Sequence, residues 1–374
     1  MTSSVELTQE LVRFNTINPP GAERACAERL ATLLKGAGFA VEVVPFGEGR
    51  AQIVARIGGT SGKLPLGFTG HIDTVPLGAQ PWSVDPLGGE IVDGKLYGRG
   101  SSDMKSGVAA FVTACLNLST KLALTPGVVL VITAGEETGC TGAAALVHES
   151  KALPNVGALV VAEPTGNRPL VGHKGALWLE AVTKGLTAHG SMPEKGVNAV
   201  YKAARAVTAL QDFDFNVARH AVLGGPTLNV GTISGGLNIN SVPDRAVIGI
   251  DIRTIPGQNH AQIRKQLTSY LGDDVVLGTK LDAQSVWTNP DDTWIRDVFR
   301  AAREIAGVSD EIGAAPYFTD ASVLTPALGA PPTAIIGPGE LELAHQTDEY
   351  CLVSRIEQAT ELYSTIIRDW CGTA

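Results

Sequence analysis

Residues 127–137 read GVVLVITAGEE, an apolar, β-branched run that starts at a glycine and ends on two adjacent acids. Two other runs have the same form: LPLGFT at 64–69, shortly before His71, and GALVVA at 157–162, directly before Glu163. Such runs, bounded by Gly or Pro, are typical of strands buried in a parallel sheet. Helical patterns alternate with them, which predicts an α/β fold with a mainly parallel sheet and helices on both faces.

Acids and histidines lie just past these predicted strands, within the Gly-rich segment YGRGSSDMKSG, or after the Pro/Gly turn in GPGELELAHQTDEY. They are Asp73, Asp103, Glu136, Glu137 and Glu163, with His71 and the far-downstream His345. Ligands of an open α/β sheet bind outside the carboxyl ends of its strands, so these side chains are expected to converge. Several carboxylates taken out of water together need a counter-charge, since even one costs on the order of several kcal/mol. The pattern therefore predicts a pair of divalent cations.

Spacing suggests separate roles for some of these residues. His71 and Asp73 are two apart on an extended segment, so Asp73 can orient the imidazole of His71. Adjacent acids at a buried strand end repel each other unless they do different work, for example metal binding by one and proton transfer by the other. Each motif alone also has an ordinary explanation: Asp103 could cap a helix, and Glu136 and Glu137 could form a solvated loop pair. Only together do they indicate a metal site.

Composition limits the other possibilities. The 374 residues are 44% hydrophobic, enough for a sizeable core, and 29 basic against 38 acidic residues give a net charge of -9. With no Lys/Arg-rich run, we expect neither a nucleic-acid nor a membrane partner. No signal-peptide pattern or long apolar stretch is found, which predicts a cytoplasmic protein. Five scattered cysteines without a CxxC spacing predict reduced thiols.

The pattern of apolar and polar residues changes near residue 175. Alternating strand patterns (ALWLEAVTKG, TLNVGTISGG and DRAVIGIDIRT) surround helical patterns at 197–210 and 260–271. This predicts an inserted α+β module with an antiparallel sheet at 176–287. The metal-binding domain would then be discontinuous, made of 1–175 and 288–374, because His345 belongs with the earlier candidate ligands.

Motifs for other chemistries are incomplete. GGTSGK at 58–63 is one residue short of a P-loop and is followed by Leu64 rather than Ser or Thr. GRGSSD at 98–103 lacks the third glycine of a dinucleotide-binding fingerprint, and no GxSxG nucleophile elbow occurs. Nucleotide binding, dinucleotide redox chemistry and serine hydrolysis are therefore disfavoured.

Seven motifs, in order along nearly the whole chain, together resemble one family. They are GHIDTVP, YGRGSSDMKSG, TAGEETG, VVAEPT, HKGALWLE, TAHGSMPEKGVNA and AHQTDEY. The family is the two-zinc amidohydrolases and peptidases that include acetylornithine deacetylase, succinyl-diaminopimelate desuccinylase, aminoacylase and glutamate carboxypeptidase.

The resemblance implies a role for each candidate ligand. Asp103 would bridge two zinc ions per subunit, and cobalt or manganese could substitute for zinc. The first ion would be held by His71 and Glu163, and the second by Glu137 and His345. A cis peptide bond between Asp103 and Met104 is also implied.

The implied chemistry is hydrolysis of an amide. A hydroxide bridging the two metal ions would attack the carbonyl carbon, since metal coordination can lower the pKa of water from about 15.7 to about 7. Glu136 would act as general base and then general acid, and Asp73 would orient His71.

The resemblance further implies a homodimer in which the inserted module serves as a dimerisation or lid domain. His189, in that module, would reach the active site of the second subunit and help to hold the oxyanion. Arg253, Asn240 and Lys174 would bind the substrate, with the Arg253 fork on its carboxylate. Thr319 and Asp320 are further candidates for the pocket wall.

Several functions remain open at this stage. The favoured one is hydrolysis of an N-acyl-L-amino acid, as in the deacetylase and desuccinylase branch. A carboxypeptidase or dipeptidase, with a dipeptide as substrate, would use the same metal chemistry. A catalytically silent protein that binds metal or an acyl amino acid is the alternative from another class, although every expected ligand and Glu136 are present.

Overall fold

The computed structural model describes residues 3–60, 62–149 and 153–373. The chain divides into two compact units, both built from segments that are separate in sequence. The first unit comprises the chain up to Gly172, Trp287–Ala314 and the chain from Thr319 onward; the second comprises His173–Val286 and Ala315–Phe318. The short strands β8 (Gly172–His173) and β13 (Val286–Trp287) lie where the chain passes between the units.

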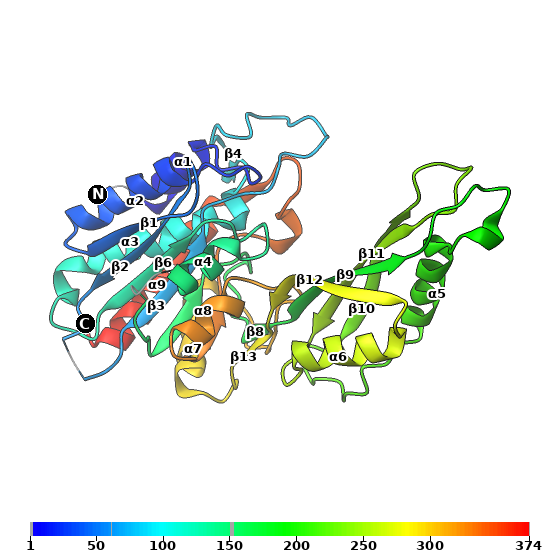
Figure 1. Cartoon of the computed structure of the whole chain (residues 1–374). Helices are drawn as coiled ribbons and strands as arrows, with labels where there is room; N and C mark the ends of the chain where they lie inside the picture. Colours follow the sequence, from blue (N-terminus) through cyan, green and yellow to red (C-terminus); the bar gives the residue numbers. More distant parts are fainter. Residues whose placement is uncertain (1–2, 61, 150–152, 374) are drawn as a thin grey trace. The chain divides into compact units, whose positions relative to one another are not determined.

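The first unit is built on a six-stranded sheet with the order β1-β2-β6-β3-β7-β14. Strands β1, β2, β6 and β3 are labelled in Figure 1. The four strands from β6 to β14 are parallel, whereas β2 is antiparallel to both of its neighbours. The predicted mainly parallel sheet is therefore confirmed, with an antiparallel pair at one edge. The bounds are β1 Ala40–Pro45, β2 Ala51–Ile57, β3 Leu66–His71, β6 Val128–Thr133, β7 Ala158–Val161 and β14 Thr333–Ile335.

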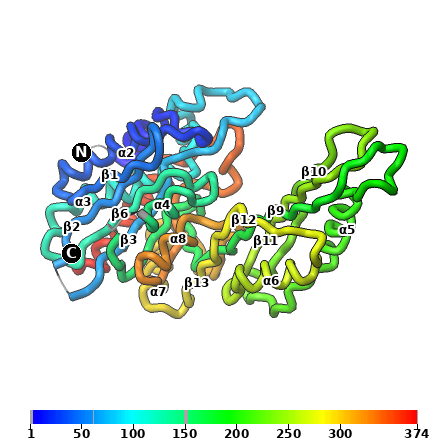
Figure 2. The backbone as a smooth tube through the Cα atoms, in the orientation of Figure 1, coloured from blue at the N-terminus to red at the C-terminus, as the bar shows by residue number. Residues whose placement is uncertain are grey.

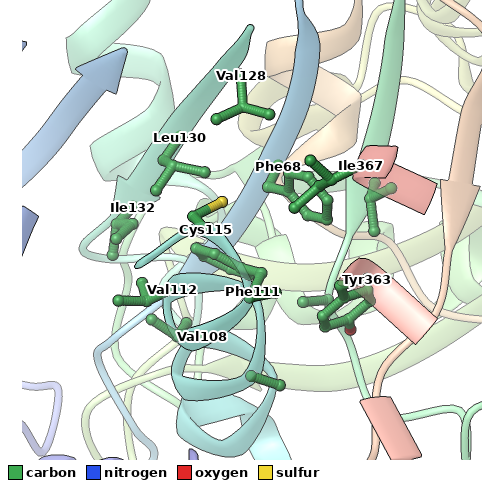
Figure 3. Packing of buried hydrophobic residues seen from close by; sticks show 14 of the residues in the cluster. Phe68, Val108, Phe111, Val112, Cys115, Val128, Leu130, Ile132, Tyr363 and Ile367 are labelled. Carbon is green, nitrogen blue, oxygen red and sulfur yellow. The ribbon is translucent and has the colours of Figure 1, made fainter. Parts of the chain in front are cut away.

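Strand β6 is buried on both faces, which explains its unbroken apolar sequence. Val128, Leu130 and Ile132 belong to the main hydrophobic core (Figure 3). Because successive side chains of a strand point to opposite faces, Val129 and Val131 point the other way, and they are equally buried. Both faces of the sheet are thus covered.

Helices supply this cover. Among them, α3 contacts α1, α2 and α9, α7 contacts α9, and α4 contacts α8. Phe68 of β3 packs between Phe111 of α3 and Tyr363 of α9, with ring centroids 5.7 and 5.6 Å away (Figure 3). The bounds are α1 Ser4–Arg13, α2 Arg24–Gly36, α3 Ser106–Leu122, α4 Thr141–Glu149, α7 Thr293–Ala306, α8 Ala321–Ala327 and α9 Val353–Cys371.

A small three-stranded sheet joins two distant parts of the first unit. Its middle strand β5 (Lys95–Tyr97) pairs with β4 (Ile91–Val92) and with β15 (Tyr350–Leu352). The segment after β5 contains Asp103, and the segment before β15 contains His345. Pairing of β5 with β15 therefore brings two predicted ligands that are far apart in sequence into one region.

The second unit is a four-stranded sheet with the order β10-β11-β9-β12 and only antiparallel pairs. Alternate residues of β11 (Ala246, Ile248, Ile250 and Ile252) form its core with α5 and α6. The chain trace in Figure 2 follows this unit from green to yellow. The bounds are β9 Gly175–Lys184, α5 Ala199–Gln211, β10 Thr227–Gly235, β11 Arg245–Thr254, α6 His260–Leu271 and β12 Val275–Ala283. The predicted separate antiparallel sheet is confirmed.

The five cysteines are all free and buried, in line with the prediction of reduced thiols.

Candidate metal centre

Two groups of possible metal ligands share one aspartate. The first is His71, Asp103 and Glu163, and the second is Asp103, Glu137 and His345. Within each group one ligand atom per residue lies within 4.8 Å of the others. His71 ends β3, and Glu163 follows β7 closely, as Glu137 follows β6. Because β6, β3 and β7 are parallel neighbours, their carboxyl ends present these side chains at one sheet edge.

The two carboxylate oxygens of Asp103 face different groups. Its Oδ1 lies 3.1 Å from Nε2 of His71, which is itself 3.9 Å from Oε2 of Glu163. Its Oδ2 lies 3.4 Å from Nε2 of His345, which is 3.2 Å from Oε2 of Glu137. One carboxylate can therefore serve two cations at once. The peptide bond between Asp103 and Met104 is cis.

Electrostatics favour positive charge at this place. Burial raises the pKa of Glu163 well above its ordinary value, and nearby acids add to the effect. Burial would lower the pKa of His71, but the carboxylates of Asp103, Glu163 and Asp73 raise it well above the ordinary value. The cluster of candidate ligands thus has more negative charge than the positive groups of the protein neutralise. Such an excess is expected where a cation binds.

The donor set fits two divalent cations. Imidazole nitrogen and carboxylate oxygen are both zinc ligands, and each group offers three of them. Oε1 of Glu137 is buried and has no hydrogen-bond partner in the described part of the chain. A buried carboxylate oxygen without a partner is costly, and a cation beside it would remove that cost.

Asp73 is fully buried and acts through both its main chain and its side chain. Its carbonyl oxygen is 2.9 Å from Nδ1 of His71, while its Oδ1 is 3.6 Å from the same nitrogen. Its carboxylate accepts hydrogen bonds from the main-chain N–H groups of Glu136 (3.2 Å) and Glu137 (3.3 Å). The side-chain amide of Asn18 donates to Oδ2 at 2.8 Å. The main-chain carbonyl of Asp73 therefore contacts the imidazole, and its carboxylate holds the segment that carries the adjacent acids.

Glu136 is buried close to the ligands but belongs to neither group. Burial raises its pKa well above the ordinary value, and Glu163, Asp320 and Glu137 raise it further. A carboxyl group with a raised pKa can hold a proton near neutral pH, which a general acid requires.

His189 and Asn240 are exposed and lie on neighbouring loops of the second unit. The N–H of Gly190 donates to the carbonyl oxygen of Asn240 at 2.7 Å, and His189 forms an isolated bridge with Ser241. Nδ1 of His189 is 2.7 Å from the hydroxyl of Ser191.

Arg253 and Lys174 also belong to the second unit. Nε of Arg253 lies 3.0 Å from a carboxylate oxygen of Asp251, and its guanidinium lies over the ring of Phe318. Nζ of Lys174 donates to the carbonyl oxygen of Gly225 at 2.7 Å. Burial lowers the pKa of Lys174, and the charges of Arg219 and Arg253 lower it further. Arg253 and Lys174, the two positively charged residues predicted to bind the substrate, are therefore near each other within this unit.

Residues 67–369 match the sequence pattern of peptidase family M20/M25/M40. The chain belongs to this family. The predicted resemblance is thereby confirmed, and the M20 chain is a hydrolase of a metallopeptidase family.

Relatives of this M20 chain match it over almost its whole length. The acetylornithine deacetylase of Proteus mirabilis is 30% identical, with 98% of this chain and 96% of the relative covered. The succinyl-diaminopimelate desuccinylase of Cereibacter sphaeroides is 30% identical, with 98% of each covered. An M20 family metallo-carboxypeptidase of Sulfolobus solfataricus shares the fold, with a TM-score of 0.79 at 20% identity and coverage of 98% and 99%.

Within the described part of this M20 chain, no helix combines the length and the apolar character needed to cross a membrane.

Of two further buried side chains near the site, Asn18 was not predicted from the sequence and Asp320 was predicted only as a candidate for the pocket wall. Asn18 contacts Asp73, as described above. Asp320 accepts a hydrogen bond from the hydroxyl of Thr133 at 2.5 Å, and burial raises its pKa to about 6. The stretch TDASVL also contains the polar residues Thr319 and Ser322, so it gives no sequence signal that would have identified Asp320 as more than a candidate for the pocket wall.

Proposed function

We propose that this M20 hydrolase cleaves the amide bond of an N-acyl-L-amino acid. The observation that carries the proposal is a buried acid, Glu136, beside two ligand groups that share Asp103 but outside both. The deacetylase and desuccinylase relatives at 30% identity support the choice of an acyl amino acid.

The metal ions would be two zinc ions, or cobalt or manganese in their place, since the donors do not select zinc alone. His71 and Glu163 would hold one ion, Glu137 and His345 the other, and Asp103 both. Bound there, the ions would polarise the substrate carbonyl and lower the pKa of water.

Proton transfer would fall to Glu136. Its carboxylate would accept a proton from the attacking water and deliver it to the nitrogen of the leaving amine. Asp73 would keep Glu136 in place for both steps, because its carboxylate accepts the main-chain N–H groups of Glu136 and Glu137.

Substrate binding would depend on the second unit. Arg253 would pair with the carboxylate of the amino acid, because its planar fork matches a carboxylate in two hydrogen bonds. Lys174 would add a second positive charge, and Asn240 a neutral hydrogen-bonding group. Arg253 already lies beside Asp251, so the substrate carboxylate would have to compete with that partner.

The second unit, which we propose to be the inserted domain at 176–287, would also mediate homodimerisation and act as a lid. Strand β10 is an edge strand with a largely exposed sequence, and unpaired strand edges favour pairing with another chain. Leu237 and Ile239 follow it and are almost completely exposed. Exposed apolar residues next to a free strand edge are typical of an interface. His189 would then help to hold the oxyanion in the site of a second copy.

A hydrolysis screen tests the proposed function. Zinc-loaded protein would be offered acetyl, succinyl and aminoacyl derivatives of many L-amino acids, with metal-stripped protein in parallel. We expect turnover of an acetyl or succinyl derivative only in the presence of metal. Preference for dipeptides would instead favour a carboxypeptidase or dipeptidase, and metal binding without any turnover would favour a silent binding protein.

A further inference from the structure

Glu349 is a fully buried acid beside the loop of the candidate ligand Asp103, and its carboxylate accepts four hydrogen bonds. Oε2 accepts hydrogen bonds from Nη1 of Arg99 at 2.5 Å and from the main-chain N–H of Gly100 at 3.0 Å. Oε1 accepts the N–H groups of Ser102 at 2.8 Å and of Asp103 at 3.0 Å. One carboxylate therefore fixes the backbone of the loop that presents Asp103.

Arg99, which is also buried, extends this network to other loops. Its Nη2 donates to the carbonyl oxygens of Pro76 at 3.2 Å and of His345 at 3.4 Å. The main-chain N–H of Gly98 donates to the carbonyl oxygen of Glu349 at 2.9 Å. The Arg99–Glu349 pair is thus in contact with the backbone of two ligands of the second group, Asp103 and His345.

The two ligand groups differ in how firmly the rest of the fold holds them. His71 is 1% exposed, ends a central strand and is bound through Nδ1 by the carbonyl of Asp73. His345 is 54% exposed and lies in a loop with a left-handed backbone conformation (φ 65°). The histidine of the first group is supported by a strand end, whereas the His345 loop depends on contacts such as that with Arg99.

We propose that Glu349 and Arg99 are positioning residues that set the affinity of the second cation site, formed by Asp103, Glu137 and His345. This inference rests on the proposed function, because it presumes that the ligand groups bind metal. A partner that orients a metal ligand typically changes the metal affinity by about 10- to 100-fold when it is replaced.

The test is Glu349→Gln. Glutamine has nearly the same size as glutamate, but an NH₂ donor replaces one of the two acceptor oxygens. That NH₂ group would face N–H donors, so their hydrogen bonds would be lost. Zinc would be titrated into stripped wild type and variant in competition with a chromogenic chelator. We expect the weaker of two zinc sites to lose about 10- to 100-fold in affinity. The tighter site shares Asp103 but also contains the strand-end ligands His71 and Glu163, so it should lose less. The visible spectrum of the cobalt-substituted protein should change, and excess zinc should restore activity.

Two further variants make the test specific. Glu10→Gln breaks a bidentate pair with Arg29 that has no contact with either ligand group, and it should leave both zinc affinities unchanged. Arg99→Lys keeps the positive charge but cannot reach Glu349 and the loop carbonyls together, so it should weaken the same site. If Glu349→Gln does not fold, the zinc affinities of Arg99→Lys test the inference instead.

The outcomes are distinct. A folded Glu349→Gln protein with two wild-type zinc affinities and an unchanged cobalt spectrum would overturn the inference, even if the protein were less stable. Should Arg99→Lys be the variant that folds, the same two readouts would decide. A wild-type protein that binds no metal would refute the proposed function as well.

Discussion

Glu136 is the side chain on which the proposed proton transfers depend. Replacement by glutamine should keep both metal ions, because Glu136 belongs to neither ligand group, but it removes the group that accepts the proton. We expect turnover to fall by at least about 100-fold. Steady-state kinetics on the best substrate, with metal content from elemental analysis, would measure both effects. Glu48→Gln, at an exposed position, is the control, and undiminished turnover in Glu136→Gln would exclude Glu136 as the base.

His173 should make stability depend on pH. Burial lowers its pKa from 6.5 to about 4, so the folded protein keeps it neutral where the unfolded chain protonates it. Its contribution is complete above pH 6.5 and is lost as the pH falls towards 4. Between pH 6.5 and 5 the loss is about 1.6 kcal/mol, because the unfolded imidazole is only half protonated at pH 6.5 and the slope approaches about 1.4 kcal/mol per pH unit below that.

Urea denaturation of zinc-loaded His173→Gln should therefore show a shallower loss of stability in this pH range than the wild type. His148→Gln replaces an exposed imidazole and should follow the wild-type profile. Parallel profiles for His173→Gln and wild type would contradict the expectation.

The candidate ligands could be identified from the sequence because each lies just past a short apolar run, within a Gly-rich loop or after a Pro/Gly turn. Sequence reasoning could not identify Arg99 and Glu349 as a pair, although both lie in motifs that it singled out. They are 250 residues apart in sequence, and only the pairing of β5 with β15 brings them together. Neither residue type nor spacing reports such a contact.

Strands β3, β6 and β7 were predictable for a related reason: each is mainly apolar and is preceded directly by Gly or Pro. Helix boundaries were less predictable from the sequence. The helical pattern from residue 197 begins as a helix only at Ala199, because the side chain of Asn198 accepts the N–H of Tyr201 and caps it. An N-cap preference for Asn is the sequence signal that would have corrected this boundary.

Helix α3 packs so closely on the end of β7 that its glycine has no room for a side chain. A Cβ at Gly107 would lie 2.2 Å from the carbonyl oxygen of Ala162, directly before Glu163. Gly107→Ala should therefore destabilise the protein by about 1–3 kcal/mol, even though alanine favours helices by about 1 kcal/mol.

Gly36 of α2 provides a matched control, because a Cβ there would meet nothing within 4 Å. Gly36→Ala should be neutral or stabilising by up to about 1 kcal/mol. Urea denaturation of the two variants would compare them, and equal stabilities would argue against tight packing of α3 on β7.

For the whole molecule, removal of metal should lower thermal stability. A ligand that binds only the folded state stabilises it by about 4 kcal/mol when its free concentration is a thousandfold above Kd. Calorimetry with and without zinc should show a higher Tm with zinc. Asp103→Ala lacks the shared ligand and should respond much less. A wild-type Tm that is independent of zinc would count against the metal site.

The discontinuity of the first unit has a consequence for biosynthesis. Its sheet is completed by β14, and its second ligand group by His345, both near the end of the chain. Domains generally fold as they emerge from the ribosome, at about 5–20 residues per second. Most of the second unit, His173–Val286, is contiguous in sequence. This unit can therefore fold before the last segment of the first unit has been synthesised. A nascent chain stopped at residue 330 would have one unit largely formed and no means of assembling the shared cation site.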